Sequence, residues 1–389
     1  MAIDDTGNRR ARLATRRAGR AIEDTESQLA TRGAGATTGG SIDDTGSGLA
    51  TPGASATAGA IGVPAPRGQT SRALLAALRE PPHRLPPIAL PDAPDPLADE
   101  DLQLALYCCY ELHYRGLPGV DERWEWSPSL LALRGALEHR FEAALRAAVG
   151  PVGQPPAPEE MDAALRAIED ADDAPSLSRH VERHATLEQV LEFLVHRSAY
   201  QLKEADPHSW AIARLSGPPK AALVEIQADE YGGGRPERVH AQMFADAMAA
   251  AGLDPRYGAY LDRIPAPTLA TVNLMSLCGL HRRLRGAIVG HLALFEMTSS
   301  IPSRRYAAGL RRLGLDDPAA TAFFDEHVEA DAVHEAIAAV DLAGGLARQE
   351  PELAGDILWG ARALVAVEGR WARWLLGAWE RGESSLRAT

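Results

Sequence analysis

Residues 319–342 read AATAFFDEHVEADAVHEAIAAVDL, and they indicate the architecture of the chain more strongly than any other segment. Successive residues of an α-helix are about 100° apart, so His327, Asp331 and His334 fall on one side of a helix built from this segment. Their neighbours along that side are mostly aromatic or aliphatic, such as Phe323 and Ile337. Two neutral imidazoles and a carboxylate that converge from an apolar helix face suit a divalent iron, manganese or zinc ion. We therefore predict a buried helix that carries metal ligands.

A second group of ligand-type residues lies earlier in the chain, at Glu230, Glu237 and His240. On an ideal helix the three would share a face, with Glu237 about 20° from Glu230 and His240 about 60° from Glu237. Residues 232–234 are glycines and Pro236 follows them, so an uninterrupted helix is not expected. Either one helix is kinked here, or one helix ends and another begins at Pro236. The glycines would also leave space for a small molecule beside a metal ion.

Two units of the form acid-x-x-His result, one at residues 237–240 and one at residues 331–334. Di-iron helix bundles combine two such units with two further carboxylates. Glu230 and Glu204 are the candidates for these, and four carboxylates against two ferrous ions would leave a buried site nearly neutral. The spacing alone is weak evidence, because residues 80–83 show it by chance within a proline-rich segment.

The pattern from residue 99 to residue 385 is helical, and no segment alternates with period two between hairpin turns. Ala and Leu are abundant and only 5% of the residues are aromatic, which favours helix over sheet. We therefore predict an all-α domain, a bundle of roughly eight or more helices around a buried centre. Residues 1–80 carry a degenerate repeat with too few large apolar side chains for a core, so we predict a disordered tail. Residues 81–98 are rich in proline and are predicted to be a linker.

Charge and cysteine content limit the partners and the compartment. The formal net charge is −13 and the pI is about 5.4, whereas nucleic-acid binding needs a basic face, so we expect no nucleic-acid partner. The three cysteines suggest no disulfide framework, and no apolar segment follows the N-terminal arginines as it would in a secretory signal. No apolar stretch is long enough to span a bilayer. We expect a cytoplasmic protein without a membrane partner.

Taken together, these residues resemble the haem-oxygenase-like di-iron oxidases and oxygenases, often described as iron-containing redox enzymes. The resemblance covers about residues 100–380 and rests on a Glu on one helix, Glu-x6-Glu-x2-His on the next and His-x3-Asp-x2-His on a third. It implies a haem-oxygenase-like helical bundle without haem, two ferrous ions, and reduction of O2 at the di-iron site. The positions that match the metal ligands of the family are Glu204, Glu230, Glu237, His240, His327, Asp331 and His334.

The function that this resemblance implies is the O2-dependent oxidation of a small organic substrate, either an amine, an amino acid or a fatty acid. The sequence has no P-loop and no dinucleotide fingerprint, so the electrons are expected from an external reductant. A homodimer is compatible with this interpretation. Two alternatives stay open: a helical ligand-binding or scaffolding protein without catalysis, and another enzyme chemistry on the same fold, such as haem degradation or thiaminase-like hydrolysis.

Three further acids have alternative interpretations. Glu296 lies in an otherwise apolar helical segment, where a carboxylate is costly to bury unless it is paired. It either pairs with an arginine or faces the cavity of the site. We interpret Glu225 and Asp229 as acids on the outer face of their helix or behind a ligand, and not as ligands themselves.

Overall fold

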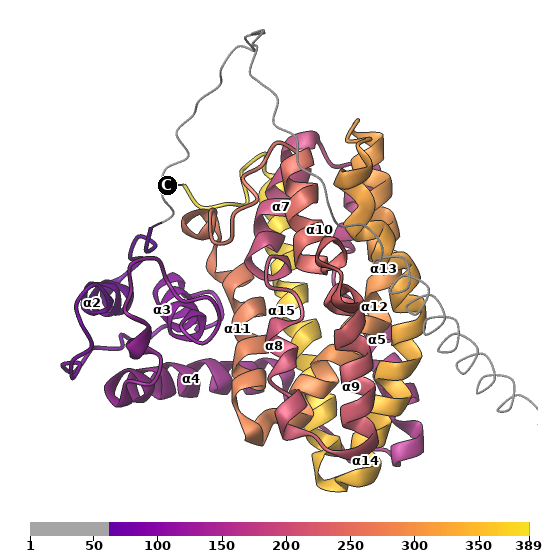
Figure 1. Cartoon of the computed structure of the whole chain (residues 1–389), viewed down its shortest axis with the longest axis horizontal. Helices are drawn as coiled ribbons and strands as arrows, with labels where there is room; N and C mark the ends of the chain where they lie inside the picture. The colour runs from indigo at the N-terminus through magenta and orange to yellow at the C-terminus, as the bar shows by residue number, and fades with distance from the viewer. Residues whose placement is uncertain (1–61, 389) are drawn as a thin grey trace, which may run out of the picture. The chain divides into compact units, whose positions relative to one another are not determined.

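The structure of the protein is a computed structural model, shown in Figure 1. It describes residues 62–388, apart from the side chains of Glu329, Asp331 and Ala332. The described residues all belong to one compact unit, Gly59–Thr389. Residues 1–61, which make up most of the predicted disordered tail, lie outside the described residues.

The described part of the chain is helical and contains no β-strand, which confirms the predicted all-α fold. None of its helices is both long enough and apolar enough to cross a lipid bilayer. The helices are α2 (Gln69–Leu78), α3 (Glu100–Glu111), α4 (Pro128–Val149), α5 (Met161–Asp170), α6 (Leu177–Arg183), α7 (Leu187–Gln201), α8 (Asp206–Ser209), α9 (Gly217–Glu230), α10 (His240–Ala250), α11 (Ala266–Leu280), α12 (Arg285–Arg312), α13 (Pro318–Ala336), α14 (Gly345–Gln349) and α15 (Ala354–Glu380).

Capping residues define the start of α7 and of α13, the two helices that position residues of the candidate site. At the start of α7, Thr186 Oγ1 accepts a hydrogen bond from Gln189 N, and Gln189 Oε1 accepts one from Thr186 N. This reciprocal pair satisfies two backbone N–H groups that the first turn of a helix leaves free. At the start of α13, Asp317 Oδ1 accepts a hydrogen bond from Ala319 N, and Pro318 occupies the first turn. Both helices therefore begin in a fixed register.

The helix α12 packs against both α13 and α15 in the bundle (Figure 1). Two glycines let α12 and α15 approach until their backbones touch. A Cβ added at Gly290 would lie 1.8 Å from the carbonyl oxygen of Ile357, and one added at Gly360 would lie 1.9 Å from that of Ala287. Because any side chain at these positions would separate the helices, this crossing fixes the depth at which α12 lies in the bundle.

The predicted boundaries of the tail and the linker need a correction. Residues 69–78 form α2 and not disordered chain, and this helix buries Leu74, Leu75 and Leu78 against the core. Residues 81–98 contain no helix of their own, but Leu85 and Leu97 are buried in the same core. The composition of the first eighty residues conceals α2, because a ten-residue amphipathic segment contributes little to an average over eighty residues.

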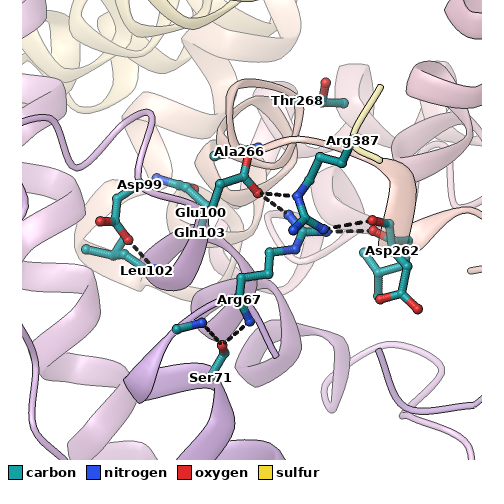
Figure 2. Close-up of polar contacts among 12 residues, drawn as sticks. Arg67, Ser71, Asp99, Glu100, Leu102, Gln103, Asp262, Ala266, Thr268 and Arg387 are labelled. Atoms are coloured by element: carbon teal, nitrogen blue, oxygen red, sulfur yellow. Dashed lines mark hydrogen bonds and ion pairs between the residues drawn. The ribbon is translucent and has the colours of Figure 1, made fainter. Parts of the chain in front are cut away.

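Polar contacts hold the segment before α2 in place, as Figure 2 shows. Arg67 donates a hydrogen bond to Glu100 Oε2 at 2.7 Å and another to the carbonyl oxygen of Leu261 at 2.7 Å. Glu100 also accepts a hydrogen bond from the backbone N–H of Ala266 and pairs with Arg387 near the C-terminus. The chain before α2 is thus joined to α3, to the start of α11 and to the C-terminal segment, so the folded domain begins well before residue 81.

Candidate metal centre

Two groups of buried acids and histidines lie next to each other inside the bundle, and Glu230 belongs to both. The first cluster consists of Glu204, Glu230, His240 and His327. The second cluster consists of Glu230, Glu296 and His334. Within each cluster the candidate ligand atoms lie within 4.8 Å of one another, and every member is buried. A carboxylate shared by two neighbouring groups is an arrangement that can hold two metal ions close together.

In the first cluster the nitrogen atoms of two histidines face carboxylates. His240 Nδ1 lies 3.0 Å from Glu230 Oε2, and His327 Nε2 lies 3.5 Å from Glu204 Oε1. His327 Nδ1 donates a hydrogen bond to the carbonyl oxygen of Phe323 at 2.7 Å, because a carbonyl can only accept. This hydrogen bond fixes the neutral tautomer of His327, so its Nε2 lone pair points toward the carboxylates.

In the second cluster His334 lies between two carboxylates. Its Nδ1 is 3.3 Å from Glu296 Oε2, and its Nε2 is 3.1 Å from Asp229 Oδ2. Asp229 is largely exposed, whereas Glu296 is only 4% exposed. When Nε2–H donates to Asp229, the Nδ1 lone pair faces Glu296 and Glu230, which is the orientation that a metal ligand needs. The outer-face interpretation of Asp229 therefore agrees with its contact behind His334.

Both clusters contain buried polar atoms that have no hydrogen-bond partner within the described residues and that could bind a divalent metal ion. Glu204 Oε2, His240 Nδ1 and His334 Nδ1 are buried and make no hydrogen bond within the described residues. Buried polar atoms are normally paired, and an unpaired one costs about 1–3 kcal/mol. One metal ion at the first cluster would bind Glu204 Oε2 and His240 Nδ1, and another at the second cluster would bind His334 Nδ1. Imidazole nitrogens together with carboxylate oxygens form the donor set of non-haem iron sites.

A tight reversal of the chain brings His240 back onto Glu230. The helix α9 ends at Glu230, short turns follow at η4 (Gly232–Gly234) and η5 (Pro236–Arg238), and α10 begins at His240. Gly232 has a φ of +70°, and a Cβ added there would lie 2.6 Å from the backbone carbon of Arg238. Of the two interpretations of this segment, the structure shows the one in which one helix ends and another begins, with the new helix starting at His240 and not at Pro236.

Five of the seven predicted ligand residues come together in the two clusters, and they are Glu204, Glu230, His240, His327 and His334. The structure does not bring Glu237 to them: this residue is exposed in η5, since the reversal at Gly232 replaces the continuous helix that would have turned it inward. The side chain of Asp331 is among those that are not described. Glu225 is exposed on α9, as expected.

Glu296 is the cluster member that the ligand pattern does not include. Its signal in the sequence was a single carboxylate within an apolar helical segment, and of its two interpretations the structure shows the one that faces the site. The helix α12 can bring Glu296 to His334 only because it packs against α13. Spacing along one helix could not reveal this contact, since the two residues belong to different helices.

A buried ion pair lies directly behind Glu204. Lys203 is 1% exposed, and its Nζ donates a hydrogen bond to Glu111 Oε2 at 2.9 Å. The ammonium group also lies 4.3 Å from the ring centre of Tyr114. Ala205, which follows Glu204, has a φ of +71°, a conformation that residues other than glycine rarely adopt. Lys203 of the ion pair precedes Glu204 in the sequence, and the strained residue Ala205 follows it. Together they hold the backbone of Glu204 so that its side chain lies in the first cluster.

The charges in the two clusters depend on one another. Burial by itself would raise the pKa of Glu230, but the three imidazoles of the clusters outweigh it and lower this pKa to about 2. Burial would lower the pKa of His334, but Glu296, Asp229 and Glu230 outweigh it and raise this pKa to about 9. Burial raises the pKa of Glu296, and the neighbouring His334 imidazole opposes that rise. Without a metal ion, a protonated His334 therefore serves as counter-charge to the acids, and a divalent ion would displace that proton.

A cavity of about 310 Å³ reaches the first cluster at Glu204 and His327. This cavity is here named the aromatic cavity, because its lining includes the aromatic side chains Phe193, Phe244, Phe295, Tyr306, Phe323 and Trp371. Such a volume lies at the lower end of the range for small-molecule sites. A surface groove of about 1150 Å³ between residues 82–90 and 123–136 contains no member of either cluster. The aromatic cavity is therefore the candidate substrate site.

Comparison with known proteins finds a family match for the segment that contains the site. Residues 191–369 match the model of the family described as iron-containing redox enzyme, and this segment contains every member of both clusters. No match was found among the curated proteins. The family and the buried Glu and His residues support an iron-dependent oxidoreductase. The segment 191–369, which contains the candidate metal centre, is thus similar to the iron-containing redox enzyme family.

Proposed function

We propose that the chain is a non-haem di-iron oxidase or oxygenase that uses O2 and an external reductant to oxidise a small organic molecule. The observation that carries this proposal is the sharing of Glu230 between the two buried clusters. One ion would be held by Glu204, Glu230, His240 and His327, and the second by Glu230, Glu296 and His334. Asp331 stays a predicted ligand of the second ion, because it precedes His334 by three residues on α13.

Charge balance supports two ferrous ions over one. Glu204, Glu230 and Glu296 provide three negative charges, and Asp331 would provide a fourth, against four positive charges from two Fe(II) ions. A buried site needs such neutrality, since an uncompensated charge in a protein interior costs several kcal/mol. Fe(II) ions bound there would supply electrons for the reduction of O2.

The side chains of this chain would position ligands, exclude water and hold protons. Asp229 orients the His334 ring through Nε2, and the Phe323 carbonyl orients His327 through Nδ1. The aromatic side chains of the cavity would limit the access of bulk water to Glu204 and His327. His334 holds a proton in the metal-free protein and would release it when iron binds, which couples iron uptake to pH.

Anaerobic titration of the full chain with Fe(II), followed by O2 addition, tests the proposal. We expect two ions per chain and a visible band that forms only when O2 is added. His334→Ala should remove the second ion and the reaction with O2, whereas Glu225→Ala, an exposed acid on α9, should change neither. A chain that takes up no iron at neutral pH would favour the alternative of a helical binding protein without catalysis.

A further inference from the structure

The helix α7 presents a stripe of side chains to the aromatic cavity that leads away from the metal centre. Phe193, Arg197 and Gln201 lie four residues apart on one side of α7, and they line this cavity together with Glu204, which follows in the turn after the helix. Each residue of a helix advances about 1.5 Å along its axis, so Arg197 lies roughly one turn before Gln201, the last residue of α7, and Glu204 follows in the turn after the helix. A molecule in the cavity with its reacting end at the first cluster would therefore contact Gln201 first and Arg197 next.

Arg197 is already occupied by a partner of opposite charge. Its two terminal nitrogens donate hydrogen bonds to the two carboxylate oxygens of Glu368 at 3.2 and 3.1 Å. Its guanidinium group also lies 4.1 Å from the ring centre of Trp371. In this bidentate arrangement, the N–H donors with which a guanidinium group binds a carboxylate are already engaged by Glu368. A ligand carboxylate would have to displace Glu368, which would then remain in the cavity without a counter-charge.

Gln201 has the opposite character, because it offers a free acceptor. This residue is 7% exposed, it lines the aromatic cavity, and its Oε1 is buried without a hydrogen-bond partner among the described residues. Leaving such an acceptor unpaired is costly in a protein interior. A ligand in the cavity with an N–H donor beside Gln201 would satisfy it.

The charges that line the cavity also favour a cation. Four acids contribute to the lining, Glu169, Asp172, Glu204 and Glu368, whereas Arg197 is the only Lys or Arg among the lining residues. Two Fe(II) ions would neutralise Glu204, and Arg197 neutralises Glu368, so Glu169 and Asp172 leave the lining of the cavity with a negative charge. Aromatic faces attract ammonium groups as well as apolar bodies.

From these contacts we propose that the aromatic cavity binds an amine carried on a small aromatic or aliphatic body and discriminates against carboxylates, with Gln201 as the residue that accepts the amine N–H. Calling this amine the substrate rests on the function proposed above. Its binding rests only on the cavity. Among the three substrate classes that the family resemblance leaves open, the cavity thus favours amines over fatty acids and over amino acids with a free carboxylate.

Calorimetric titration of the full chain with three probes of similar size tests this preference. The probes are phenethylamine, 2-phenylethanol and 3-phenylpropanoate, and the protein is loaded with Fe(II) under anaerobic conditions so that the cluster carboxylates are neutralised. We expect phenethylamine to bind most tightly and 3-phenylpropanoate most weakly. Equal or tighter binding of 3-phenylpropanoate would overturn the proposal.

Two substitutions at one position test the role of Gln201. Gln201→Leu keeps the size of the side chain and removes the acceptor, so phenethylamine should bind about tenfold more weakly, as expected for a hydrogen bond to a charged group. Gln201→Glu adds a negative charge and should strengthen binding of the amine. Gln69→Leu, at an exposed glutamine on α2 that does not line the cavity, is the control and should leave binding unchanged. Unchanged affinity in Gln201→Leu would overturn the assignment of this residue.

Glu368→Gln tests the reason for the discrimination. This variant keeps the shape of the side chain and releases the guanidinium of Arg197, so 3-phenylpropanoate should gain about tenfold or more in affinity. No gain would contradict the argument that Glu368 blocks this arginine. The proposed function fails separately, by an absence of iron uptake. In that case the comparison of wild type with Gln201→Leu in the metal-free protein still decides the role of Gln201.

Discussion

The sequence pattern names Glu237 as a metal ligand, whereas the structure places Glu296 in the second cluster and leaves Glu237 exposed. Replacing each residue by Gln shows which of the two carboxylates is needed for iron binding. Glu296 is 4% exposed, and its Oε2 lies 3.3 Å from His334 Nδ1. Glu237 is exposed in η5 and belongs to neither cluster. The substitutions Glu296→Gln and Glu237→Gln are nearly isosteric, so each removes a charge with little change of packing.

The expected effects differ greatly in size. Replacing a residue that only orients a ligand typically lowers metal affinity about 10–100-fold. Replacing a true ligand should therefore lower metal affinity by more than about 100-fold, which corresponds to about 2.7 kcal/mol of binding free energy. Glu296→Gln should therefore reduce the iron content from two ions to one. It also removes the strongest group that raises the pKa of His334, so this pKa should fall from about 9 toward its ordinary value in the metal-free protein. An exposed acid such as Glu237 should change stability by no more than about 0.5 kcal/mol and leave iron uptake intact.

Two measurements read these outcomes. Anaerobic Fe(II) titration gives the stoichiometry and the affinity of each ion, and an NMR titration of the metal-free protein gives the pKa of His334. Two bound ions in Glu296→Gln together with a lost ion in Glu237→Gln would refute the reasoning. Such a result would mean that iron binding unfolds the turn between Gly232 and Arg238 and draws Glu237 inward.

Four further outcomes follow from the structure. The folded pKa of His334 lies above its unfolded value, so its contribution to the stability of the metal-free protein is full below about pH 6.5 and is lost as the pH rises through about 9, which urea unfolding at several pH values would show. Gly232→Ala should weaken iron binding at the first cluster, measured by Fe(II) titration, since its Cβ would push Arg238 away and displace His240. Lys203→Met leaves Glu111 buried without its cation, so the free energy of unfolding measured in urea should fall by about 3–5 kcal/mol. The double variant Lys203→Met/Glu111→Gln should recover most of this loss. Removal of residues 1–80 deletes α2 with its three buried leucines and should lower the thermal unfolding temperature markedly, because each buried leucine contributes about 1.5–3 kcal/mol.

The sequence by itself determined the class of fold and most of the candidate site. Helical periodicity is a local property, so it places His327 and His334 on one face of α13 without any knowledge of the rest of the chain. The spacing between Glu230 and His240, and the presence of a lone Glu204, belonged to a recognisable ligand pattern. All five of these residues lie in the two clusters.

Tertiary structure decided which carboxylates accompany these five residues. Glu237 and His240 would share a face on a continuous helix, but the backbone of Gly232 reverses the chain, so only His240 returns to Glu230. Glu296 comes from α12, whose depth is set by its glycine-mediated crossing with α15. The sequence analysis missed the helix α2 for a related reason. A short amphipathic helix becomes stable only through the surface on which its leucines pack. Periodicity and spacing describe neighbours along one helix, whereas contacts between helices depend on backbone reversals and close crossings that only the folded chain contains.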